Sequence, residues 1–91
     1  MAFLLTRIGV DDYDAWKPMF DSDPAGARKA AKGHRISRSV ENPNEVFVQV
    51  EFASADEAKT ARERLLSSGV LDRVTVKTEP TVTEEAESVA Y

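Results

Sequence analysis

The chain has 91 residues, no cysteine and a formal net charge of −4. This length fits a single domain, and the lack of cysteine excludes disulfide bonds and thiolate chemistry. The strongly apolar run at Phe3, Leu4 and Leu5 is too short for a signal peptide or a membrane span. We therefore expect a cytoplasmic protein with no membrane partner.

The first part of the sequence predicts a strand and then a helix. Apolar side chains alternate over residues 2–10, which is typical of a strand. Asp11 is a suitable N-cap for the helix that follows. In that helix Tyr13, Trp16 and Phe20 recur at helical spacing and share one face.

Two prolines are expected to break this helical region. Pro18 lacks an amide hydrogen and should kink the helix. Pro24 is favoured at a first helical position, so it predicts a second helical piece that ends near residue 32, just before Gly33.

The remainder of the sequence predicts a hairpin, a helix and a last strand. Val40 is expected to pair with Val46 across a turn at residues 41–44. The run from Ser54 to Glu57 is a capping box and predicts a helix that ends at Gly69. Strands are predicted over residues 34–40, 45–52 and 73–77.

The resulting order of strand, helix, strand, strand, helix and strand predicts an α+β, ferredoxin-like βαββαβ protomer. Its four-stranded antiparallel sheet should carry two helices on one face. We assign residues 1–78 to this domain. Residues 79–91 contain four acidic and no basic side chains, so they are expected to form an acidic tail or an arm that swaps between subunits.

The second face of such a sheet has no helix to cover it. Its predicted residues mix aromatic, aliphatic and charged side chains, which suits an interface between two copies of the chain better than exposure to water. The alternative is a solvated face with a few scattered apolar residues. The predicted interface residues are Phe3, Leu5, Arg7, Phe47, Gln49, Glu51 and Thr75.

Two stretches together resemble a known family: residues 12–21 (DYDAWKPMFD) and residues 41–46 (ENPNEV), which run into a valine-rich strand. They are similar to small bacterial proteins of the dimeric α/β-barrel superfamily. That superfamily also contains cofactor-free antibiotic-biosynthesis monooxygenases, and some members are named cyclases. The resemblance covers about residues 2–78, and His34 matches the histidine that is typical of the start of the hairpin strand.

This resemblance implies that two sheets close into a dimeric α/β barrel, with C-terminal segments that reach the partner. It also implies a small-molecule cavity between each sheet and its helices. It implies no particular reaction, since this subfamily has none that can be transferred, and fold alone does not settle function.

Candidate site residues follow from the aromatic stripe and the single histidine. His34 is a possible general base, because histidine changes charge near neutral pH; a strand-start histidine can equally have a structural role. Tyr13, Trp16, Phe20 and His34 are expected to line a ligand pocket, although an aromatic stripe at this spacing also suits an ordinary core.

The sequence lacks the residues that other kinds of active site require. One histidine and no cysteine give no recognisable metal site, and the isolated glycines form no phosphate-binding loop. We expect no cofactor. An RRM-like single-stranded RNA binder has the same element order, with Phe3 and Phe47 as its stacking platform. However, Glu45-Val46 and Gln49 replace the basic, glycine and aromatic residues of that signature.

The function predicted from the sequence is a homodimeric α/β barrel that binds a small, partly apolar molecule. A cofactor-free, monooxygenase-like or cyclase-like reaction is the enzymatic version. The alternatives are a non-catalytic structural dimer and, less favoured, the RNA binder. The residues do not decide whether the protein is an enzyme.

Overall fold

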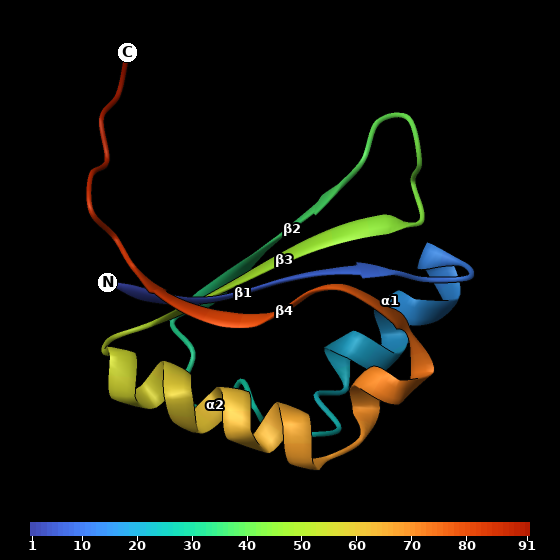
Figure 1. Ribbon diagram of the computed structural model, residues 1–91, viewed down its shortest axis with the longest axis horizontal. Coiled ribbons are helices and arrows are strands. Elements are labelled where there is room, and N and C mark those ends of the chain that lie inside the picture. The colour runs from blue at the N-terminus through green and yellow to red at the C-terminus, as the bar shows by residue number, and fades with distance from the viewer.

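The computed structural model describes residues 1–91 and contains one sheet with its helices on a single face (Figure 1). The four strands are antiparallel and lie in the order β2-β3-β1-β4. This is the ferredoxin-like α+β arrangement predicted from the sequence. The elements in chain order are β1 (Ala2–Gly9), α1 (Tyr13–Asp21), β2 (Gly33–Arg38), β3 (Glu45–Phe52), α2 (Ala55–Ser67), the short 3-10 helix η1 (Val70–Arg73) and β4 (Thr75–Glu84).

The hydrophobic core lies between the helices and the inner face of the two central strands, β1 and β3. Period-two alternation turns every second residue of these strands to this face. In their antiparallel register Leu4 lies opposite Val50 and Ile8 opposite Val46. The buried core residues are Ala2, Leu4, Ile8, Trp16, Ala27, Val46, Val48, Val50, Phe52, Ala58 and Ala61.

Helix α1 begins one residue later than predicted and is not followed by a second helix. Asp12, not Asp11, is the N-cap, because its carboxylate accepts a hydrogen bond from the Asp14 amide at 3.2 Å. The helix continues through Pro18 and ends at Asp21. Residues 22–32 then form turns, so the helix predicted from Pro24 to residue 32 is wrong.

The physical reason lies at Asp23, which has a left-handed backbone with φ of 48°. Its carbonyl accepts from the Gly26 amide at 2.9 Å, and its carboxylate accepts from the Arg28 amide at 3.1 Å. Local bonds of this kind compete with helix formation. They hold the segment as a loop beside the sheet.

Helix α2 begins where the capping box predicts. The Ser54 hydroxyl accepts a hydrogen bond from the Glu57 amide at 3.2 Å. Past the other end of the helix, Gly69 has φ of 75°, a conformation that glycine adopts without a Cβ clash. The chain then enters η1, which ends at Arg73. Arg73 was predicted to begin the last strand, and that prediction is wrong.

The β2–β3 hairpin has a longer loop than predicted. Ile36 lies opposite Val48 and Arg38 opposite Val46, so the predicted pairing of Val40 with Val46 is wrong by two residues. Val40 is outside the strand and 97 % exposed. A shift of two residues keeps the same side chains inward, so Ile36 still packs against the core.

Strand β4 is longer than the predicted segment at residues 73–77 and is irregular. It runs to Glu84, which lies opposite Ala2. Its register to β1 shifts between Leu5 and Ile8, near the buried Pro80. Proline cannot donate to a strand ladder, so it is accepted at such a bulge. Residues 79–84 therefore extend the sheet; swapping of the later residues between subunits stays a prediction.

Candidate functional site

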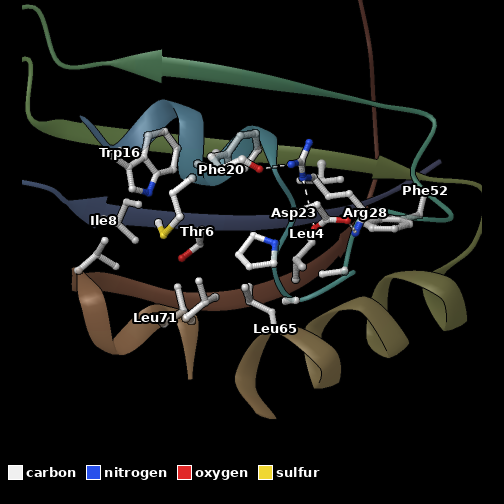
Figure 2. Close-up of a pocket in the computed structure, with 18 residues that line it drawn as sticks. Leu4, Thr6, Ile8, Trp16, Phe20, Asp23, Arg28, Phe52, Leu65 and Leu71 are labelled. Carbon is white, nitrogen blue, oxygen red and sulfur yellow. Dashed lines mark hydrogen bonds and ion pairs between the residues drawn. The ribbon is translucent and has the colours of Figure 1, made fainter. Parts of the chain in front are cut away.

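A mainly apolar cavity lies between the inner face of the sheet and the helices (Figure 2). Its volume is about 90 Å³, and 14 of its 18 lining residues are hydrophobic. The floor comes from alternate residues of the two central strands, namely Leu4, Thr6 and Ile8 of β1 with Val48, Val50 and Phe52 of β3.

The walls of the cavity come from α1, from α2 with η1, and from the loop after α1. Trp16, Met19 and Phe20 of α1 form one wall, and Leu65 of α2 with Leu71 of η1 lies across from them. The turns at residues 23–28 close a third side. Because these turns replace a helix, they pack less uniformly over the sheet, and this irregularity leaves space.

Three polar side chains reach the cavity: Thr6, Asp23 and Arg28. The Thr6 hydroxyl donates to the Thr78 carbonyl at 2.8 Å, across the irregular part of the β1–β4 pairing. Arg28 Nε lies 3.8 Å from Asp23 Oδ1. The Arg28 guanidinium also donates to the Phe20 carbonyl and lies 4.0 Å from the Phe20 ring centroid. The two opposite charges therefore face each other at the cavity wall.

The four predicted ligand-binding residues form one aromatic row. Ring centroids are 5.8 Å apart for Tyr13 and Trp16, 5.1 Å for Trp16 and Phe20, and 5.2 Å for Phe20 and His34. The first three follow from helical spacing on α1. His34 joins them because it is the second residue of β2 and lies opposite the inward-facing Val50.

Only the middle of this row reaches the cavity. Trp16 and Phe20 line it, whereas Tyr13 and His34 do not. Tyr13 is half-buried under the Arg38 guanidinium, 3.9 Å from its ring centroid. His34 is exposed and contacts Phe20 edge-on. The geometry thus brings the predicted residues together without placing His34 in the cavity.

Sequence reasoning missed Asp23, Arg28 and Thr6. The first two lie in or next to the segment that was predicted as a second helix, so no role at a site was predicted for them. Their actual role depends on the loop geometry at Asp23. Thr6 is the one polar residue on the inner face of β1, between Leu4 and Ile8, and that break in the pattern was the available signal.

The opposite face of the sheet is not covered by any element of the chain. The predicted interface residues share it, since Phe3 lies opposite Glu51, Leu5 opposite Gln49 and Arg7 opposite Phe47. Thr75 lies opposite Gly9 at the end of the same face.

Arg7 links two neighbours on this uncovered face. Its Nε lies 2.6 Å from Glu45 Oε1, without the angle of a hydrogen bond, and its guanidinium lies 5.8 Å from the Phe47 ring centroid. Phe47 itself is 41 % exposed. The uncovered face therefore carries a large apolar ring beside a compensated charge.

No protein-family model matches this chain, and neither does any curated protein sequence. The fold is similar to a solved structure from Deinococcus radiodurans, a protein named as a candidate antibiotic biosynthesis monooxygenase. The match covers 100 % of this chain and 98 % of the other, with a TM-score of 0.65 and 12 % sequence identity. This likeness confirms, at the level of the fold, the resemblance found in the sequence.

No helix of the chain combines the length and the apolar composition needed to cross a membrane. No three histidine, cysteine, aspartate or glutamate side chains come together in the structure. The cavity with its aromatic wall is therefore the site on which a function can be argued.

Proposed function

We propose that this protein is a homodimeric α/β barrel that binds a small, largely apolar molecule in the cavity between its sheet and its helices. The observation that carries the proposal is the cavity itself, about 90 Å³ of space lined mainly by hydrophobic side chains. Close packing normally leaves little apolar space beside a core, so this space is a candidate binding site. Apolar walls with a few polar groups are typical of ligand sites.

The dimeric part of the proposal is supported by the uncovered face. Phe3, Leu5 and Phe47 together are poorly suited to water, and a second copy would cover them. In Figure 1 the helices lie below the sheet, and the segment after β4 rises on the other side. This acidic segment is thus on the side where a second copy would sit.

The same face gives less support to RNA binding. Phe3 lies opposite Glu51, which is four residues from Phe47 along β3. The two rings are therefore separated by about 13 Å along the strands. Neighbouring bases stack on aromatic side chains that lie close together, so these two rings do not form one platform.

A cofactor-free oxygenation is the reaction class that best suits such a site, if the protein is an enzyme. In that chemistry the substrate supplies the electrons; one atom of O₂ enters the product as a carbonyl and the other leaves as water. His34 would act as the base only for a substrate large enough to extend from the cavity past Phe20. The non-catalytic alternative keeps the ligand and has no reaction.

We also propose the cytoplasm as the compartment, because a chain without cysteine has no disulfide bond that would need an oxidising compartment.

The experiment is a titration with toluene, a small apolar probe. Trp16 is the only tryptophan and lines the cavity, so its fluorescence reports occupancy. We expect saturable binding together with a rise in thermal stability, since a ligand that binds only the folded state stabilises it. Ala25→Leu adds three carbon atoms at the cavity wall and should abolish both effects.

The matched control is Ala53→Leu, because Ala53 is exposed and does not line the cavity. It should bind toluene as the unmodified chain does. An absence of saturable binding, or binding that Ala25→Leu leaves unchanged, would overturn the proposed function.

A further inference from the structure

The indole nitrogen of Trp16 is a hydrogen-bond donor without a partner. Trp16 is only 8 % exposed, and no hydrogen bond in the structure uses its Nε1. In Figure 2 this nitrogen points from α1 towards Ile8 on the cavity floor. The indole N–H can only donate, and a largely buried tryptophan usually finds an acceptor for it.

The unpartnered nitrogen is not fully enclosed by the protein. The only fully enclosed side-chain nitrogen or oxygen without a hydrogen bond is Arg7 Nε, on the other face of the sheet. Trp16 Nε1 therefore retains accessible surface. Since the cavity lies beside Trp16, a molecule in it can reach this donor.

From this geometry we infer that the ligand is a neutral molecule of about one ring that carries an oxygen acceptor for the Trp16 Nε1 hydrogen. Phenols and small cyclic ketones belong to this class. The inference rests on the proposed function, which it narrows by naming the chemical class of the ligand and the residue that selects it.

The charges at the cavity require the ligand to be neutral. The only ionic side chains that line it are Asp23 and Arg28, and these face each other at 3.8 Å. The Asp23 carboxylate also accepts from the Arg28 amide within the loop, and the Arg28 guanidinium also donates to the Phe20 carbonyl in α1. No charge remains to pair with an ionic ligand, and an unpaired buried ion is strongly disfavoured.

The volume limits the ligand to about one ring. An engineered apolar cavity of about 150 Å³ in another protein encloses benzene. The present cavity is smaller, at about 90 Å³, and partly open to solvent, so it takes at most one ring, with part of that ring outside the cavity. A larger substrate would need the turns at residues 23–28 to move away from the sheet. Selection of the ligand therefore depends on one hydrogen bond within a tight apolar space.

The experiment compares phenol with toluene, which have nearly the same shape but differ in the oxygen. Ligand-detected NMR gives the two affinities for the unmodified chain and for Trp16→Phe. In the variant the preference for phenol over toluene should fall roughly fivefold, as expected for loss of one neutral hydrogen bond. Ala53→Leu changes an exposed residue outside the cavity and should leave the preference unchanged.

A second readout needs no variant. Because the chain has a single tryptophan, its NMR spectrum contains one indole N–H signal. Phenol should move that signal downfield and toluene should not. If both probes bind but neither the preference nor the signal distinguishes them, the inference is overturned and the proposed function survives. If neither probe binds, the proposed function itself fails.

Discussion

The same strands present different kinds of side chain on the two faces of the sheet. On the inner face β3 presents Val46, Val48, Val50 and Phe52, each at most 6 % exposed. On the outer face the same strand presents Glu45, Phe47, Gln49 and Glu51, of which Phe47 is 41 % exposed. On β3 the inner face is entirely apolar, whereas the outer face combines one aromatic ring with an amide and two carboxylates.

This difference shows what each face is suited to contact. Aliphatic side chains without polar atoms suit permanent burial against α2 and a dry cavity. Aromatic rings beside paired charges, such as Phe47 beside Arg7 and Glu45, suit a surface between subunits. The inner face should therefore control folding and ligand binding, and the outer face should control assembly.

The largest expected effect is a loss of stability on removing a phenylalanine from the inner face of β3. Phe52 is fully buried on the inner face of β3. Phe52→Ala should lower the free energy of unfolding by about 3–5 kcal/mol, because it removes apolar contacts and leaves a cavity. Denaturant unfolding followed by Trp16 fluorescence measures this change, at concentrations low enough to keep the chain monomeric.

The matched control is Phe47→Ala, which removes the same ring from the outer face of the same strand. Under these dilute conditions it should cost less than half as much, since Phe47 already contacts water. Equal losses in the two variants would show that the outer face is part of the core and would contradict the division of roles.

A smaller effect tests assembly alone. Phe47→Glu places a charge in the proposed interface, and we expect the dimer dissociation constant to rise at least 30-fold, the equivalent of about 2 kcal/mol at a central aromatic residue. Light scattering on a size-exclusion column, across a dilution series, gives the mass. Unfolding of the separated monomer should change little.

The control for this variant is Val40→Glu, which adds the same charge at a position that is 97 % exposed and outside the strands. Its mass should match that of the unmodified chain. A chain that is monomeric at every concentration before any substitution would reject the barrel and leave the outer face without a partner.

The fold could be predicted from the sequence wherever a local pattern has one solution. Alternation in β3 and the cap at Ser54 each specify an element without reference to the rest of the chain. The hairpin register could not be obtained in this way, because it depends on the turn, where Ser39 N bonds Glu45 O at 3.0 Å. The length of β4 was also missed, since Pro80 reads as a strand end and its bulge depends on β1.

The candidate site was predictable only in part, for a different reason. Helical spacing places Tyr13, Trp16 and Phe20 on one face, and this was enough to predict the three members of the aromatic row that lie on α1. A cavity, however, is a space between elements, and no residue in the sequence marks it. Its polar wall depends on the left-handed backbone at Asp23. The sequence around Pro24 favours a helix, so this backbone conformation could not be predicted.

The smallest expected effect concerns the helix that covers the inner face. Ser54→Ala removes the hydroxyl that accepts from the Glu57 amide at 3.2 Å, and it should lower the free energy of unfolding by about 1 kcal/mol. Because α2 does not touch the outer face, the dimer dissociation constant should stay the same. Denaturant unfolding and light scattering on one preparation measure both quantities.

Ser67→Ala is the matched control, since Ser67 is the last residue of the same helix and caps nothing at its start. Alanine is a good helix former, so this change should stay within about 0.5 kcal/mol of the unmodified chain. A Ser54→Ala variant that weakened the dimer as well would show that the two faces communicate through the sheet. The roles of inner and outer face would then be coupled, and the ligand in the cavity would be expected to influence assembly.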